Sequence, residues 1–117
     1  MLLIIVALLI NVAVLISVTF GLLGGSAQMD AAFGPATPAR GILLSVYLAI
    51  LLLSLAGLAG VIWSGAQALP WIATLIALQV VYKVITAIVV GPSNPVVQAN
   101  LAIALFHSIA LWAALTR

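Results

Sequence analysis

The side chains of this sequence that could do chemistry are few, and four of them gather in one apolar stretch. Gln79, Tyr82, Lys83 and Thr86 are spaced i, i+3, i+4 and i+7. On an α-helix this spacing places all four on one face, where they form a polar stripe along an otherwise apolar surface. Amide, phenol and ammonium groups are hydrogen-bond donors, so the stripe is a candidate ligand-binding face.

A second, weaker polar face lies near the C-terminus. Asn100 and His107 are seven residues apart and therefore share a helix face. They complete a candidate ligand-binding set of six residues, the other four being those of the stripe. A single histidine cannot provide two haem ligands, and the sequence has no cysteine, so no metal site is expected.

No residue is assigned a catalytic role. The sequence contains no nucleophile elbow, phosphate-binding loop or pair of carboxylates. The residues therefore favour a non-catalytic protein over an enzyme, and no cofactor is evident, although Lys83, Tyr82 and His107 would suit a quinone as hydrogen-bond donors.

The composition determines the medium in which these residues lie. The chain has 117 residues, of which 68% are hydrophobic and 3% are charged, whereas ordinary soluble domains are roughly a quarter charged. This composition predicts a single integral membrane domain over residues 1–117, with the lipid bilayer as its main partner. The sequence has no basic patch, so no nucleic-acid partner is expected.

Four apolar segments have about the 20 residues that a helix needs to cross the hydrocarbon of a bilayer. They predict helices over residues 2–23, 42–63, 71–90 and 96–116, because backbone polar groups in lipid must be satisfied within the segment. The last three are joined by short connections and should pack antiparallel. The expected fold is an all-α, four-helix transmembrane bundle with up-down-up-down topology, and residues 24–41 form its long extramembrane loop.

The connections carry recognisable helix-end signals. Pro70 suits the first turn of the third helix, where its missing N–H has no cost. Gly91 is expected to end that helix, Asn94 to cap the fourth and Pro95 to occupy its first position.

The long loop holds two of the four charged residues, Asp30 and Arg40, which are expected to form an ion pair. Phe33 and two prolines lie between them. The loop is expected either to lie on the membrane surface or to cover a cavity as a lid.

Lys83 has three interpretations inside such a bundle. Its ammonium could extend along the helix toward the membrane surface, or it could make a structural contact with Gln79, Tyr82, Asn100 or a folded-in Asp30. The third interpretation is that Lys83 binds a ligand, either a quinone oxygen or an anionic headgroup.

Orientation and association are less strongly encoded. Trp63, Trp71 and Trp112 are expected near the boundary that also holds both termini, because tryptophan prefers the membrane interface. The positive charges differ little between the two sides of the membrane, since Arg117 lies on the side of the termini and Arg40 on the other. This distribution gives a slight bias toward cytoplasmic termini, and so small a bias also permits dual insertion.

One face of the second expected helix is built of small residues, which allow helices to approach closely in lipid. This face is expected to pack inside the bundle or, alternatively, to form a homodimer. Its members are Ser45, Ala49, Ala56 and Gly60.

The layout resembles the small four-helix bacterial membrane proteins of the broad DoxX-like type. The similarity rests on the length, the four segments, the P-A-T-P-A-R entry to the second helix and the basic residue at Y-K in the third. The resemblance implies the bacterial cytoplasmic (inner) membrane and either quinone-connected redox chemistry or a role as an accessory subunit. No functional residue is carried over from it.

Three functions remain open at this point. The first is a non-catalytic protein that binds an apolar or amphipathic ligand in the bundle, or an accessory subunit of a larger membrane complex. The second is a quinone-linked redox partner with its site between the third and fourth helices. The third is a small dimeric membrane transporter.

Overall fold

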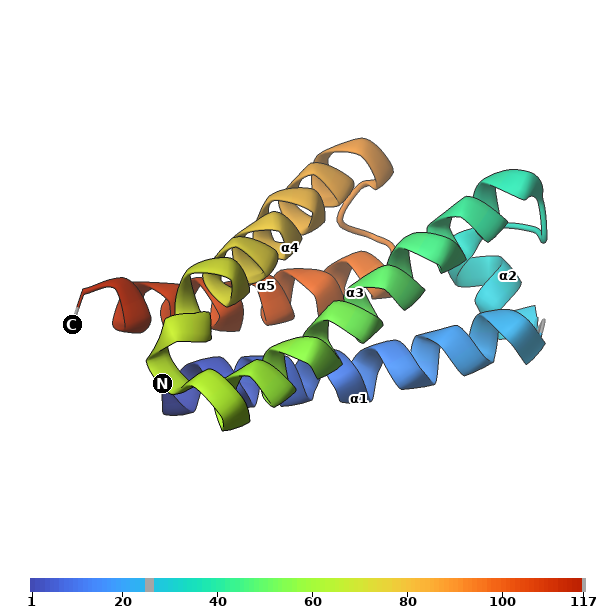
Figure 1. The fold of residues 1–117 in the computed structure, drawn as a ribbon. Helices are drawn as coiled ribbons and strands as arrows, with labels where there is room; N and C mark the ends of the chain where they lie inside the picture. Colours follow the sequence, from blue (N-terminus) through green and yellow to red (C-terminus); the bar gives the residue numbers. More distant parts are fainter. Residues whose placement is uncertain (25–26, 117) are drawn as a thin grey trace.

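The computed structural model describes residues 1–24 and 27–116, and within these ranges the secondary structure is entirely helical (Figure 1). The elements are α1 (Leu2–Gly24), α2 (Ala27–Phe33), α3 (Pro38–Ser64), the 3-10 helix η1 (Gly65–Ala68), α4 (Leu69–Val90) and α5 (Pro95–Leu115). The predicted all-α class is confirmed. Residues 25–26 of the expected loop, and Arg117, on which the orientation argument partly depends, lie outside the described residues.

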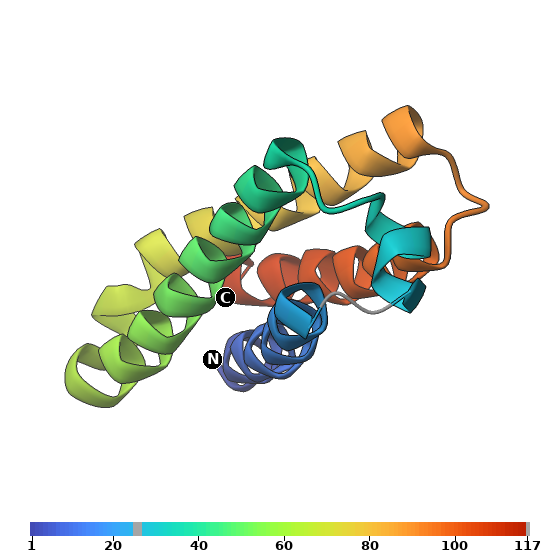
Figure 2. The ribbon, with the colours of Figure 1, turned by 90° about the vertical axis from the view of Figure 1, so that its right-hand side faces the viewer.

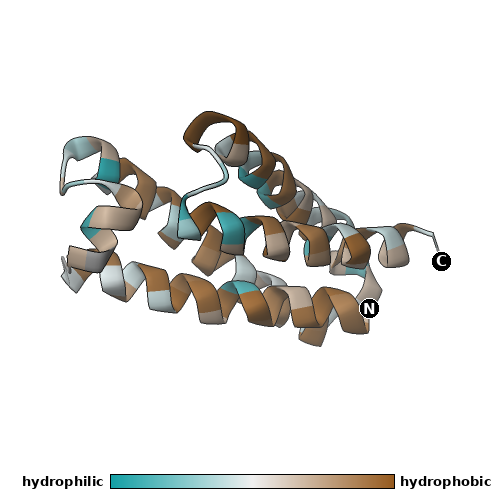
Figure 3. Cartoon of the chain, turned by 180° about the vertical axis from the view of Figure 1, so that it is seen from behind, coloured by the Kyte–Doolittle hydropathy of each residue, from teal (hydrophilic) through white to brown (hydrophobic). Residues whose placement is uncertain are grey.

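Three helical stretches among the described residues are long and apolar enough to cross a membrane: Leu2–Gly24, Pro38–Val90 and Pro95–Leu115. The middle stretch has 53 residues and contains α3, η1 and α4. Large apolar side chains such as Ile62, at 84% exposure, point outward, and Figure 3 shows that hydrophobic residues make up most of the ribbon. A continuous apolar exterior of this kind is typical of a protein surrounded by lipid, so the chain is an integral membrane protein.

The segment 24–41 is not the continuous loop that we expected. It contains α2, and α3 begins at Pro38 rather than at residue 42. Thr37 caps α3, because its side-chain oxygen accepts a hydrogen bond from the Arg40 N–H at 3.4 Å, and Pro38 lies in the first turn. Met29 and Phe33, one helical turn apart in α2, both pack against the core.

The other helix ends follow the sequence signals. Pro70 lies in the first turn of α4, and Gly91 ends that helix with a φ of 99° that favours glycine. Asn94 caps α5 by accepting a hydrogen bond from the Val96 N–H at 2.8 Å. The short connection expected between the second and third helices is the 3-10 helix η1, which continues directly into α4.

The end of the molecule that holds both termini and η1 is closely packed, and we call it the closed half (Figure 1). Gly57 of α3 allows close approach here, since a Cβ atom on it would lie 3.3 Å from Leu8 and 3.5 Å from Ile72. The buried core of this half consists of Ile4, Ala7, Leu8, Ala68, Ile72, Leu75, Ile76 and Ala110.

The opposite end is built differently, and we call it the open half. There α3 and α4, which meet at η1, move apart, as both ribbon views show (Figures 1 and 2). The short helix α2 lies across this end, near the end of α1 and the start of α5 (Figure 2). The buried cluster in this half is smaller and consists of Leu15, Leu22, Tyr47 and Ile50.

We had expected the small-residue face of α3 to pack inside the bundle, but most of its members do not face the interior. Three of them are exposed: Ser45, Ala49 and Ala56. Gly60 is partly buried, and a Cβ atom on it would lie 3.2 Å from the ring of Trp71. The small residues of α3 that are buried are Ser54 and Gly57, which lie on a different side of the helix.

Candidate functional site

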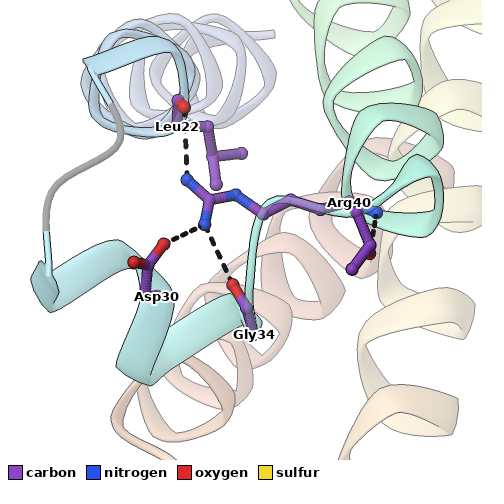
Figure 4. Close-up of polar contacts among 5 residues, drawn as sticks. Leu22, Asp30, Gly34 and Arg40 are labelled. Carbon is purple, nitrogen blue, oxygen red and sulfur yellow. Dashed lines mark hydrogen bonds and ion pairs between the residues drawn. The ribbon is translucent and has the colours of Figure 1, made fainter.

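The candidate site lies in the open half and is covered by α2. The buried side chain of Arg40 holds this helix in place (Figure 4). Arg40 Nη1 donates to the carboxylate of Asp30 and, at 2.9 Å, to the carbonyl of Gly34. Its Nη2 donates to the carbonyl of Leu22 at 3.2 Å. The ion pair expected between Asp30 and Arg40 is thus present, and the same guanidinium also joins the last turns of α1 to the start of α3.

Asn94 makes a second connection to α2. While its side-chain oxygen caps α5, its amide nitrogen donates to the carbonyl of Ala32 at 3.0 Å. The sequence pattern predicts the cap but not the second bond, because that bond links residues 62 positions apart. Together, Arg40 and Asn94 connect α2 to the end of α1 and to the starts of α3 and α5.

Two wide cavities lie beneath α2 in the open half. The first has a volume of about 360 Å³ and lies between α1, α2 and α5, where Val14, Val18 and Ile103 make its walls apolar. The second, of about 520 Å³, is more polar, because α3, α4 and α5 contribute phenol, hydroxyl and amide groups. These polar side chains are Tyr47, Tyr82, Thr86, Asn94 and Asn100.

A third, much smaller cavity of about 30 Å³ lies deeper in the bundle, where Asn11, Gln79, Lys83 and Asn100 reach its lining. Phe33, Val96 and Asn100 line this void and both wide cavities. The three spaces therefore adjoin one another around the first turns of α5.

The cavities bring together five of the six candidate residues. Gln79 and Lys83 are buried, at 1% and 4% exposure, and both line the small void. Tyr82 and Asn100 line the void and the polar wide cavity, and Thr86 lines the polar cavity alone. The stripe on α4 therefore faces the interior over its whole length.

Lys83 has an unusual environment. With 4% of its surface exposed, it does not extend to the exterior of the molecule. Its Nζ lies 5.9 Å from the centroid of the Tyr82 ring, near the outer limit of a cation–π contact. Within the described part of the chain it makes no hydrogen bond or ion pair, and Asp30 is engaged by Arg40 instead.

Some of the other polar side chains around the cavities have partners, whereas the hydroxyls of Tyr47 and Tyr82 and the Asn100 amide make no hydrogen bond to the described residues. The Gln79 side chain donates to the carbonyl of Leu75 at 3.4 Å, and Thr86 donates to the carbonyl of Tyr82 at 2.7 Å. Asn11 donates to the hydroxyl of Ser54 at 3.3 Å. Asn11 and Gln79 are thus paired, whereas Lys83 is the one charged side chain at the void and makes no hydrogen bond or ion pair to the described residues.

His107 is separated from the other candidates. It is fully buried in the closed half, beside the backbone of Ala7, and lines none of the cavities described above. Neither ring nitrogen makes a hydrogen bond of ordinary geometry to the described residues. Asn100 and His107 share a helix face, but the length of the helix between them places only Asn100 at the cavities.

Two contributors to the site were not among the six candidates. Asn11 carries the one amide side chain of α1, and its position at the middle of an apolar segment is a signal that could have identified it. Tyr47 gives no such signal, because an aromatic residue in a membrane helix is ordinary. It lines the small void and the polar wide cavity, and the Phe33 ring packs edge-on against it with the centroids 6.1 Å apart.

As a chemical environment, the site offers hydrogen-bond donors and one ammonium inside apolar walls. Among the described residues, no group of three histidine or acidic side chains could hold a metal ion. Comparison of the chain with protein-family models, with curated protein sequences and with solved structures finds no match.

Proposed function

We propose that the protein binds an apolar or amphipathic ligand in the open half, either on its own or as an accessory subunit of a larger membrane complex. The observation that carries this proposal is the ammonium of Lys83, which is buried at the edge of a cavity and, beyond its contact with the Tyr82 ring, has no hydrogen bond or ion pair to the described residues. A buried charge without a partner is strongly destabilising, so its presence favours a group supplied from outside the chain.

The proposal includes a topology of four membrane spans. At about 1.5 Å per residue, the 27 residues of α3 and the 22 of α4 are each long enough to cross the bilayer. The turn at η1 between them supports an up-down arrangement. Both termini and the exposed Trp63 and Trp112 would then lie on one side of the membrane, with α2 on the other.

In this arrangement α2 acts as a cover for the cavities. Its Phe33 reaches into the space that all three cavities share, and Arg40 and Asn94 hold the helix at that position. A ligand would enter beneath α2 or laterally from the bilayer, through the gap where α3 and α4 diverge.

A quinone is a second candidate for the occupant. Tyr82, Lys83 and Asn100 present donors to the same space, and quinone carbonyls are acceptors. His107, the other donor expected in a quinone site, lies in the closed half. A quinone site would therefore depend on α4 and the first turns of α5.

Native mass spectrometry of the protein extracted from its membrane tests the proposal, because it reports bound lipid, quinone and partner subunits together. We expect a small molecule to remain bound to the native chain. Ala99→Phe fills the apolar cavity and should abolish this adduct. Ala102→Phe is the matched control, because Ala102 is exposed on the same helix and lines none of the described cavities. A native chain without any adduct, or an adduct that survives Ala99→Phe, would contradict the proposal.

A further inference from the structure

We infer that the ligand is a single-chain amphiphile with a carboxylate headgroup. Its carboxylate pairs with Lys83 in the small void, and its hydrocarbon chain lies in the apolar cavity between α1, α2 and α5. This inference rests on the proposed function and deepens it by naming the chemical class of the ligand.

The charge of the headgroup follows from the acidic groups of the chain. The sequence contains one acidic side chain, Asp30, and Arg40 engages it at the end of the bundle. Lys83 is the only lysine of the sequence, and no carboxylate side chain of the chain is left to pair with it. An anionic ligand would supply the missing charge, whereas a neutral ligand would leave the ammonium buried and uncompensated.

The size of the headgroup follows from the void beside Lys83. Its volume of about 30 Å³ exceeds the roughly 10–15 Å³ that a water molecule needs, so it admits a small polar group. Asn11 and Gln79 each use one amide N–H in the hydrogen bonds already described, so each retains a second N–H for an acceptor in the void. A carboxylate oxygen fits this space and these donors, whereas the headgroup of a two-chain phospholipid would extend out of the void into the adjoining cavities.

The position of the chain follows from the difference between the two wide cavities. The 520 Å³ cavity presents Tyr47, Tyr82 and Asn94. The 360 Å³ cavity has walls of valine, isoleucine, alanine, methionine, proline and phenylalanine, with Asn100 as its polar lining residue where it adjoins the void. A hydrocarbon chain is better accommodated by the second cavity, and Asn100 marks the point where headgroup and chain meet.

A direct test uses the fact that Lys83 is the only lysine. Protein labelled with ¹⁵N at the lysine side chain is placed in phosphatidylcholine bilayers with palmitate labelled with ¹³C at its carboxyl group. Solid-state NMR should then show dipolar coupling that corresponds to an N–C distance within ion-pair range, about 4 Å. Bound palmitate without coupling to the lysine nitrogen would overturn the inference.

A ligand series separates the failure of this inference from the failure of the proposed function. In nanodiscs, palmitate should bind the native chain about tenfold or more tightly than 1-hexadecanol, because a hydrogen-bonded charge distinguishes them. Lys83→Met should remove that difference, and acetate, which lacks the chain, should not bind measurably. If the Lys83→Met variant does not fold, the affinities of the native chain for palmitate, hexadecanol and acetate decide whether the inference holds.

Each other outcome has a definite meaning. Equal binding of palmitate and hexadecanol, with both lost in Ala99→Phe, would overturn the inference of a carboxylate headgroup. The proposed function would then still stand. Acetate binding as tightly as palmitate would overturn the chain position. If neither long-chain compound binds and the extracted protein also carries no adduct, both proposals are overturned.

Discussion

The closed and open halves of the molecule are built from the same four long helices but differ in how close those helices lie. In the closed half, Ala7, Gly57, Ala68 and Ala110 allow the backbones to approach, and Ile72 fills the remaining space with no exposure. In the open half, Tyr47 on α3 and Tyr82 on α4 flank a widening gap, which α2 covers.

This difference shows how a small membrane protein can combine stability with a cavity. Helices in lipid associate through close van der Waals packing and gain little from hydrophobic burial. The packed closed half therefore supplies most of the association energy. The open half has a smaller apolar cluster and is also held by polar contacts at its rim, namely the bonds of Arg40 to Asp30, Gly34 and Leu22 and the bond of Asn94 to Ala32. The two kinds of contact should respond differently to mutation.

The largest expected effect is in the closed half. Gly57→Leu places a bulky side chain where even a Cβ atom would lie 3.3 Å from Leu8. We expect the free energy of unfolding to fall by about 3 kcal/mol, since overpacked cores are strained. Ala56→Leu, on the exposed face of the same helix, should change it by less than about 0.5 kcal/mol. Unfolding by steric trapping in bicelles measures both, and equal effects would mean that the closed half is not tightly packed.

The next effect is local to the open half. Arg40→Met removes the donors to Asp30, Gly34 and Leu22, so α2 should lose about 2 kcal/mol of docking free energy. Amide hydrogen exchange in α2 should accelerate about 30-fold, while exchange in the closed half stays unchanged. Asp30→Asn is the milder variant, because Asp30 is 51% exposed and Arg40 keeps both carbonyl acceptors. Acceleration spread over the closed half would show that the two halves unfold together.

The smallest effect separates the two roles of Asn94. Asn94→Ala loses both the cap of α5 and the bond to Ala32. The free energy of unfolding should fall by about 1 kcal/mol or slightly more. Asn94→Ser retains a capping oxygen and loses only the bond to Ala32. Exchange of the first α5 amides should therefore accelerate in the Ala variant alone, whereas α2 should loosen in both. Identical profiles would mean that Asn94 acts through one bond only.

The local features of this fold are readable from the sequence because local chemistry produces them. Pro70, Gly91 and Asn94 mark helix ends by properties of their own backbone and side chain, and each lies where the pattern predicts. The spacing of Gln79 and Lys83 likewise predicts that they share a face, and both are buried. The helix α2 is missed because seven residues are too few for a search based on membrane-length segments.

The composition of the site is less predictable, for a geometric reason. Helical periodicity gives the direction of a side chain around its own axis, but it does not give the angle between two helix axes. The divergence of α3 and α4 decides that Tyr47 reaches the cavity lining. The depth along α5 decides that Asn100 does so and His107 does not.

The central claim, a packed half beside an accessible one, can be tested on a single helix. The sequence has no cysteine, so Asn100→Cys and Ala104→Cys each introduce the only thiol, one helical turn apart. Asn100 lines all three cavities, whereas Ala104 is buried in α5 at 4% exposure and lines none of them. The measurement is the rate of modification by methyl methanethiosulfonate in bilayers. We predict fast modification of Asn100→Cys that slows when palmitate is added, and slow modification of Ala104→Cys with or without it. Equal rates, or a faster reaction at Ala104→Cys, would contradict the account.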